Sequence, residues 1–373
     1  MKHLLGALAL VLAIPPALAQ SHPLEVANPK HTVQLVKTIA PPAGLVAPKP
    51  AEQSAYLLVY FKDETHDIYF ATSPDGYTFT DVNGGQPVAL GRVLAEQKGV
   101  RDPHLMRGPD NAFYMAMTDL HIYGKGAGHR STEWERPIEG YGWGNNQNLI
   151  LMKSFDLIHW THARVKVAAL FPQVGDLGAV WAPETIWDDK AQRPMVYYTT
   201  RVGAAPNTLV YAYADLAFNT LETEPKTLFT YPIKGKSAID GDITKIGDKY
   251  HLFYVAHDDP GFLRQAISDR INEGFVFNPQ KVDPETDYTE APTLWHRHGT
   301  QTYVLMYDVF GAKPRNNMGF SETTDFVNFK NLGRFNEPGS PMKAANFVGA
   351  KHGAVIAISP AEMARLQRYF AQK

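Results

Sequence analysis

A strand unit that recurs four times constrains the fold of this chain more than any other feature. Each copy opens with an acid-headed strand and continues with an aromatic strand, a strand of small residues and a short outer strand. The first strands of the copies start around Asp102, Val180, Ala238 and Thr289. Four-stranded units repeated around an axis are the blades of a β-propeller, so the repeat predicts four complete blades.

The two ends of the chain supply the parts of a fifth unit. Three predicted strands, at residues 56–61, 68–73 and 77–80, precede the first copy and lack an acid-headed strand, and one strand, KHGAVIAIS from Lys351, follows the last copy. We therefore predict an all-β, five-bladed propeller in which the N-terminal strands and the C-terminal inner strand close one blade. A β-sandwich or a solenoid is the rival, but a sandwich would not explain why the missing first strand reappears at the far end of the chain.

The outer strands of the four copies should be the short aromatic segments that end each repeat. They are expected at Trp160, at Phe218, and at residues 275–277 and 326–329. Aromatic residues favour strands, which is consistent with these positions.

Segments outside the repeat have their own signatures. Residues 1–19 combine a basic start, an apolar run and the small residues Ala17 and Ala19, which is typical of a secretory signal cleaved after Ala19 and predicts a secreted or periplasmic protein. Residues 20–51 are rich in proline and read as an extended lead-in. The propeller should occupy residues 52–360, and residues 361–373 should form a short helix over its closure.

Composition narrows the partners. A net charge of -2 gives no electrostatic reason to expect nucleic acid or an anionic membrane, and no apolar run is long enough to span a bilayer. The absence of cysteine excludes disulfides, which a large core can do without. An aromatic content of 12% favours a protein that meets sugars or other flat-faced ligands, although strand cores account for most of these rings.

Ionisable residues head all five predicted inner strands, which face the axis of a propeller. They are Asp102, Glu184, Asp240, Glu290 and His352. Acids that converge on one axis suit glycoside hydrolysis, in which one carboxyl protonates the leaving group and another activates water. A simple role as a turn or cap at a strand start stays open, most of all for Glu184 and His352.

Candidate sugar contacts surround these acids. Trp181 and Arg101 stand next to predicted strand heads. The loop at residues 120–147 is glycine-rich, carries Trp143, and should overhang the pocket. A second loop, at residues 308–317, carries Lys313 and Arg315, for which a solvated surface position is the better interpretation.

The motifs resemble those of glycoside hydrolase family 43, the five-bladed arabinofuranosidases, xylosidases and arabinanases, over residues 55–359. The matching segments are RDPHL at Asp102, WAP before Glu184, AIDGD at Asp240, EAP at Glu290, and His-Gly at His352. The resemblance implies that Asp102 is the base, that Glu290 is the acid, and that Asp240 orients the acid and modulates its pKa.

The same resemblance bears on cofactors. Two carboxyls suffice for the chemistry, so none is required, but the axial His352 lies at or near a bound ion in several family members, which allows a structural calcium ion at the axis. There are two departures from the family pattern. Three strands precede the Asp102 strand, and Asp242 adds a carboxylate that could exchange roles with Asp240.

These features together predict an exo-acting, inverting glycosidase of an oligo- or polysaccharide, with α-L-arabinofuranosidase as the first choice. Inversion predicts a separation of roughly 6.5–9.5 Å between the carboxyls of Asp102 and Glu290. A related enzyme that acts on xylosides or galactosides is one alternative, and a non-catalytic sugar-binding propeller is the other. The oligomeric state is not constrained by the sequence.

Overall fold

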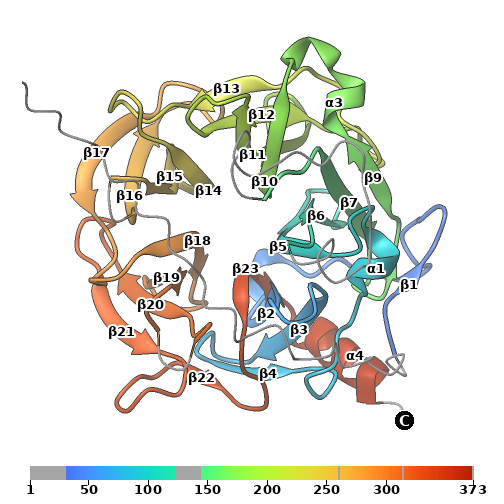
Figure 1. Ribbon diagram of the computed structural model, residues 1–373. Helices are drawn as coiled ribbons and strands as arrows, with labels where there is room; N and C mark the ends of the chain where they lie inside the picture. The colour runs from blue at the N-terminus through green and yellow to red at the C-terminus, as the bar shows by residue number, and fades with distance from the viewer. Residues whose placement is uncertain (1–30, 123–143, 259–260, 313–314, 372–373) are drawn as a thin grey trace, which may run out of the picture.

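A computed structural model describes residues 31–122, 144–258, 261–312 and 315–371 of the chain. Five antiparallel sheets stand around a central axis as the blades of a propeller (Figure 1). The predicted signal segment, the loop aromatic Trp143 and the loop cation Lys313 lie outside the described residues. Within them, no helix has both the length and the apolar character needed to cross a membrane.

Four blades are continuous in sequence, and their strands are ordered from the axis outward. The first is β5 (Val100–Arg107), β6 (Phe113–Asp119), β7 (Asn148–Ser154) and β9 (Ala163–Lys166). The second is β10 (Leu177–Asp188), β11 (Arg193–Val202), β12 (Thr208–Tyr213) and β13 (Lys226–Phe229). The third is β14 (Ala238–Ile246), β15 (Lys249–Ala256), β16 (Phe262–Ser268) and β17 (Val276–Lys281). The fourth is β18 (Thr289–His296), β19 (Tyr303–Val309), β20 (Gly319–Thr323) and β21 (Lys330–Arg334).

The fifth blade joins the two ends of the chain and confirms the predicted closure. Its innermost strand is β23 (Lys351–Ile358), which pairs with β2 (Ala55–Phe61) in antiparallel register. The sheet continues through β3 (Ile68–Ser73) and β4 (Thr78–Asp81), and ends on the two-residue strand β22 (Lys343–Ala344). Figure 1 shows blue β2 and red β23 side by side near the axis.

Three of the four predicted outer strands were wrong, and the one in the third blade was correct in part, since residues 276–277 begin β17. The second blade ends on β13, whereas Phe218 lies in the preceding turn, buried and edge-on to Tyr114 at 5.1 Å between ring centroids. Trp160 belongs to β8 (His159–Trp160), which pairs with β1 (Gln34–Leu35) of the lead-in rather than with its own blade. Residues 326–329 precede β21. Phe218, Phe326 and Phe329 pack between blades from a turn, so their apolar character serves packing and not strand pairing.

The core is divided into five apolar clusters, one between each pair of adjacent blades. Such side-to-side packing leaves the ends of the inner strands free to face the axis. The C-terminal helix α4 (Pro360–Ala371) covers the closure and packs Leu366 and Phe370 into the first of these clusters. Its Glu362 forms a bidentate ion pair with Arg107 of β5, at 2.8 Å for the shorter contact. The short elements η2 (Pro50–Glu52), α1 (Gly91–Leu94), α3 (Val167–Leu170) and η3 (Pro172–Val174) lie in the lead-in and the loops.

Candidate active site

Each inner strand is interrupted by a bulge close to its start. The strand registers shift at the same relative place in β5, β10, β14, β18 and β23. One non-glycine residue at each shift has a positive φ, and the residue after it is proline or glycine. The five positive-φ residues are Asp102 (52°), Ala182 (42°), Asp240 (50°), Ala291 (53°) and His352 (25°). A bulge re-aims side chains, and a left-handed backbone at a non-glycine residue costs roughly 1–3 kcal/mol, so this strain is concentrated at the axis.

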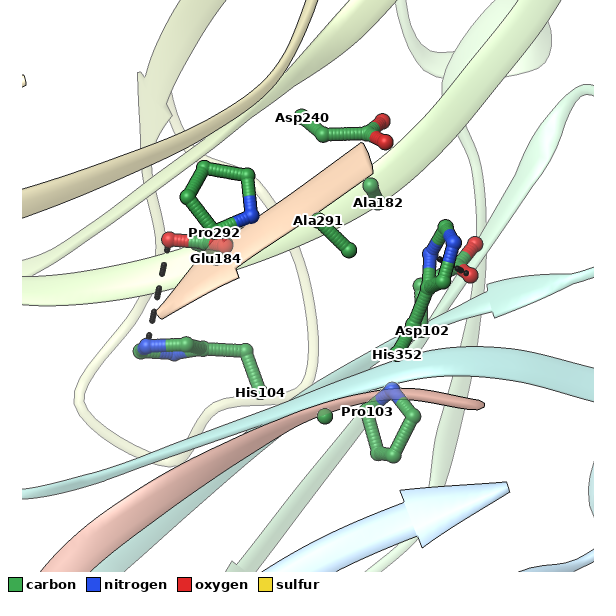
Figure 2. Close-up of a pocket in the computed structure, with 10 residues that line it drawn as sticks. Asp102, Pro103, His104, Ala182, Glu184, Asp240, Ala291, Pro292 and His352 are labelled. Carbon is green, nitrogen blue, oxygen red and sulfur yellow. Dashed lines mark ion pairs between the residues drawn. The ribbon is translucent and has the colours of Figure 1, made fainter. Parts of the chain in front are cut away.

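The bulges show that the five predicted strand heads do not occupy equivalent positions in their blades. Asp102, Asp240 and His352 occupy the equivalent bulge position, but Glu290 stands one residue before it and Glu184 stands two residues after it. The five strand heads are therefore not one ring of equivalent residues. Their side chains belong to two clusters. The upper cluster is His352, Asp102, Asp240, Glu290 and Asp308, and the lower cluster is Glu184, His104 and Asp242. Four of the five strand heads, all but Glu290, line one narrow axial cavity of about 10 Å³ (Figure 2).

Side chains of neighbouring blades satisfy the backbone N–H groups that the bulges free. The Ala182 N–H donates to Thr118 Oγ1 at 2.8 Å, and the Asp240 N–H donates to Thr199 Oγ1 at 3.0 Å. Thr118 in turn donates its hydroxyl hydrogen to Asp102 Oδ2 at 2.8 Å. Because the partner always comes from the preceding blade, the packing of blade on blade fixes where each acid stands.

His352 is the centre of the upper cluster. Its Nδ1 lies 2.8 Å from Asp102 Oδ1, and its Nε2 lies 3.0 Å from Asp308 Oδ2 and 3.5 Å from Glu290 Oε2. The ring is buried, and the contacts are close without being aligned as hydrogen bonds, so they act mainly between charges. Figure 2 shows the ring of His352 against the carboxyl of Asp102.

Electrostatics separate the protonation states within this cluster. Burial is the largest single influence and opposes charge on both Asp102 and His352, but the attractive interactions together outweigh it. The charge of His352, with help from Arg101 and the Thr118 hydroxyl, holds the pKa of Asp102 well below its usual range. The charges of Asp308 and Asp102 raise the pKa of His352 well above its usual range. At neutral pH the cluster therefore holds an ionised Asp102 beside an imidazolium.

Asp240 behaves in the opposite way. Burial first, and then the negative charge of Glu290, raise its pKa to about 8, although the Ala291 N–H donates a hydrogen bond to it. Asp240 therefore keeps its proton at neutral pH. The axis thus carries an ionised carboxyl and a protonated carboxyl at the same pH, which is the combination that acid–base catalysis needs.

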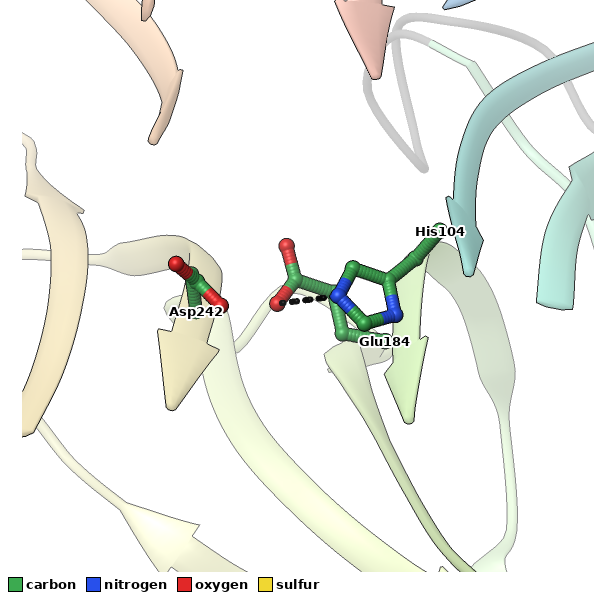
Figure 3. A group of neighbouring side chains, drawn as sticks. All are labelled: His104, Glu184 and Asp242. Atoms are coloured by element: carbon green, nitrogen blue, oxygen red, sulfur yellow. Dashed lines mark ion pairs between the residues drawn. The ribbon is translucent and has the colours of Figure 1, made fainter. Parts of the chain in front are cut away.

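The lower cluster contains His104, Glu184 and Asp242 (Figure 3). Glu184 Oε2 accepts a hydrogen bond from the Tyr197 hydroxyl at 3.0 Å and lies 3.9 Å from His104 Nε2. Asp242 Oδ2 accepts the Leu294 N–H at 2.8 Å. Burial raises the pKa of Glu184 well above its usual range and that of Asp242 to about 7, so this pair also keeps a proton.

The position of Asp242 bears on the exchange of roles left open by the sequence. Asp242 points into the lower cluster, toward Glu184 and the fourth blade, while Asp240 faces Glu290 and His352 in the upper one. The bulge between them cancels the strand alternation that would have put both on one side. Asp240 is therefore the residue placed to act on Glu290.

Neither cluster has a donor set that fits a calcium ion. In the upper one, Asp240, Glu290 and His352 are close enough to share an ion, but both nitrogens of His352 already face carboxylate oxygens. A ring protonated on both nitrogens has no lone pair for a metal, and two remaining carboxyls fall short of the six to eight oxygens that calcium takes. In the lower cluster, His104 Nδ1 accepts the Thr185 N–H at 3.1 Å, which leaves its proton on Nε2, the atom that faces Glu184.

The remaining predicted contacts are distributed around the axis. Arg101 is buried in an ion pair with Asp63 at 3.0 Å, and so faces a protein carboxylate. Trp181 is half-buried and donates its indole N–H to Gly144 O at 2.7 Å. Arg315 is exposed in the bend that precedes β20. These three do not line the axial cavity, whereas Glu184 and His352 do.

Asp308 is the residue of the upper cluster that the sequence interpretation missed. It lies in β19 directly opposite Glu290 of β18, and it also accepts the His352 N–H. The attraction of His352, and then of Lys351, overcomes its burial and lowers its pKa. The available signal was an aspartate at the end of an otherwise apolar strand, MYDV, beside the strand that carries Glu290.

Comparisons with known proteins agree with this architecture. Residues 52–364 match a family model described as a probable glycosyl hydrolase domain, related to glycoside hydrolase family 43. A curated α-L-arabinofuranosidase of Bifidobacterium longum subsp. longum is 23% identical over 221 residues, which is 54% of this chain but only 20% of that protein. The crystal structure of a xylan β-1,4-xylosidase from Bacillus halodurans is similar in fold, with a TM-score of 0.52, 13% identity, and coverage of 74% of this chain and 52% of that one. A Clostridium thermocellum α-L-arabinofuranosidase matches with a TM-score of 0.49 and 12% identity, over 76% of this chain and 84% of that one.

Carboxyls that converge on the axis of a five-bladed propeller suit glycoside hydrolysis. The extent of the family match makes the assignment specific. This chain belongs to the probable glycosyl hydrolase domains related to glycoside hydrolase family 43, and it is a glycosidase of that type.

Proposed function

We propose that this glycosidase removes terminal α-L-arabinofuranosyl residues from oligo- or polysaccharides with inversion at the anomeric carbon. The observation that carries the proposal is the placement of two acids on opposite nitrogens of His352, Asp102 at 2.8 Å from Nδ1 and Glu290 at 3.5 Å from Nε2. The choice of arabinofuranoside rests on the similarity to the Bifidobacterium enzyme, which extends over about half of this chain.

In the proposed mechanism Asp102 removes a proton from the attacking water. Its carboxylate is held ionised by His352 and oriented by Thr118, so only the water need be positioned. Glu290 donates its proton to the glycosidic oxygen as the bond to the anomeric carbon breaks. Asp240 disfavours early loss of that proton, because a second negative charge beside it is costly in a buried site.

Inversion is favoured by the position of the His352 ring. The ring contacts Asp102 through Nδ1 and Glu290 through Nε2, so the two carboxyls are separated by an imidazole. Retaining enzymes need a nucleophile only about 5–5.5 Å from the acid, while inverting enzymes leave room for a water between them.

A panel of aryl glycosides tests the substrate. We expect the fastest turnover with 4-nitrophenyl α-L-arabinofuranoside, and slower turnover with the β-D-xyloside and β-D-galactoside. Proton NMR of the first-formed sugar should show the β-anomer. A faster xyloside or galactoside would replace the proposed sugar, and an α-anomer would exclude inversion.

Glu290→Gln tests the catalytic assignment. Because the amide has no proton to donate, we expect kcat on an unactivated substrate to fall about 10²–10⁴-fold. The fall should be much smaller with a 2,4-dinitrophenyl glycoside, whose leaving group needs no protonation. Wild-type turnover of both substrates by this variant would remove Glu290 from the mechanism.

A further inference from the structure

Two residues outside the axial clusters adjoin the proposed acid. Tyr288 lies two residues before Glu290, so both side chains project to the same side of the chain as it enters β18. Burial, and then the negative charge of the nearby Glu290 carboxyl, raise the pKa of the Tyr288 hydroxyl. The same hydroxyl contacts His257 Nε2, which belongs to the turn after β15.

The ring of Tyr288 is closely packed. Phe310 stands edge-on to it at 4.9 Å between ring centroids, and the Phe310 N–H donates to Tyr288 O at 3.0 Å. Gly261 is close as well, since a Cβ atom there would come within 2.5 Å of Tyr288 Cε2. A ring packed against both a phenylalanine and a glycine backbone has little freedom, so its hydroxyl has a fixed position.

We propose that Tyr288, oriented by His257, is a positioning residue for Glu290. The inference rests on the proposed role of Glu290 as general acid and adds the groups that aim its carboxyl. A general acid acts only if its proton points at the glycosidic oxygen in the transition state, and small displacements of a catalytic group are costly. Asp240 and His352 lie beside Glu290 at the axis, and Tyr288 precedes it by two residues in the chain and is close enough to act on its charge.

The Tyr288 hydroxyl can change its hydrogen-bond partner when Glu290 loses its proton. A tyrosine hydroxyl has one hydrogen to donate and lone pairs to accept with. When Glu290 is protonated, the hydroxyl donates to a neutral His257 Nε2 and its oxygen faces the acid. Once Glu290 has lost its proton, the hydroxyl can turn and donate to the carboxylate instead. Burial lowers the pKa of His257, which keeps the ring neutral and able to accept.

Removal of the hydroxyl in Tyr288→Phe is the direct test. With the glycone that the panel identifies, we expect kcat on the unsubstituted phenyl glycoside to fall about tenfold to a hundredfold, with KM nearly unchanged. Turnover of the 2,4-dinitrophenyl glycoside should stay within about twofold, since that leaving group departs without an acid. Tyr231→Phe is the matched control, because its hydroxyl donates to Asp258 at 2.8 Å and the expected change is small for both substrates.

Two further substitutions separate positioning from a purely structural role. Gly261→Ala keeps the Tyr288 hydroxyl but displaces its ring, and should reproduce the same dependence on the leaving group. His257→Leu should do so more weakly, and His257→Gln, which retains a polar partner for the hydroxyl, should restore most of the loss. A crystal structure of Tyr288→Phe should show the Glu290 carboxyl turned from its wild-type position.

The outcomes separate the positioning role of Tyr288 from the acid role of Glu290. Equal losses on both substrates, or a higher KM with unchanged kcat, would make Tyr288 a structural residue or a sugar contact and overturn the proposal. An unmoved Glu290 in the variant structure would overturn it without any activity measurement. If Glu290→Gln itself shows no dependence on the leaving group, the proposed role of Glu290 fails, whatever Tyr288 does.

Discussion

His352 Nδ1 lies 2.8 Å from Asp102 Oδ1, and this contact joins the last strand of the propeller to the first strand of its first complete blade. The charge that keeps the proposed base ionised is therefore supplied by the strand that closes the ring. An unclosed propeller would leave Asp102 buried without its cation, at a cost of several kcal/mol. Closure of the propeller therefore also brings the cationic ring of His352 to Asp102, the proposed base.

Asp308→Asn should weaken the base without unfolding the protein. His352 would lose one of its two closest anions, become a weaker cation, and stabilise ionised Asp102 less. We expect a decrease in kcat of about tenfold or more, and an upward shift of the acid limb of the kcat/KM profile, because Asp102 would need a higher pH to ionise. Asp110→Asn is a control of the same chemistry, since Asp110 pairs with Lys153 outside the two axial clusters. An unshifted acid limb would show that Asp308 does not act through His352.

The alkaline limb of activity should reflect the proton of Asp240. A carboxyl whose pKa is raised keeps its proton below that value and loses it above, and the new negative charge then lies beside Glu290, so kcat/KM should fall as the pH passes about 8. Asp240→Asn has no proton to lose and should remove this limb. A wild-type limb near the ordinary carboxyl range, about pH 4, would contradict the raised pKa of Asp240.

Asp242→Asn should stabilise the protein at alkaline pH. The folded state binds the Asp242 proton more tightly than the unfolded chain, so the free energy of unfolding falls as the pH rises from 3.8 to about 7. Asparagine keeps an oxygen acceptor for the Leu294 N–H and has no proton to lose. We expect a gain on the order of 2 kcal/mol at pH 8, and little change at low pH where Asp242 is protonated. Urea denaturation at both pH values measures this, and an equal effect at both would refute the linkage.

Thr118→Val should affect stability and activity together. The change leaves the Ala182 N–H without its acceptor and Asp102 without the hydroxyl that orients it. We expect a loss of about 1–3 kcal/mol in the free energy of unfolding and a lower kcat. Thr118→Ser keeps the hydroxyl and serves as the control. If serine and valine behave alike, the hydroxyl is not the group that matters.

Chelation of divalent metal ions should change neither activity nor thermal stability. Both ring nitrogens of His352 face carboxylates, so the cation at the axis is the imidazolium itself. Dialysis against EDTA followed by a thermal melt with and without added calcium checks this. A rise in the melting temperature with calcium alone would indicate a cation site that the axial donors do not provide.

Much of the candidate site was accessible from sequence because it depends on local motifs. A proline or glycine follows the bulged residue of every inner strand, as in the RDP, WAP, IDG, EAP and HG segments. Asp102, Asp240 and Glu290 could therefore be selected from spacing and resemblance. Outer strands could not, because an apolar residue in a buried turn, such as Phe218, has the same pattern as a short strand.

The sequence by itself determined the number of blades, the joining of the two chain ends in one of them, and which acids approach the axis. Only the tertiary structure decided how those acids are divided between two clusters, which of them pairs with His352, and that Asp308 completes the set. The physical reason is the bulge. A strand alternates its side chains with a period of two, but one left-handed residue breaks that period and re-aims the residues around it. Which neighbour each re-aimed carboxyl then meets, a cation or another acid, depends on the adjacent blade, and that neighbour sets its protonation state.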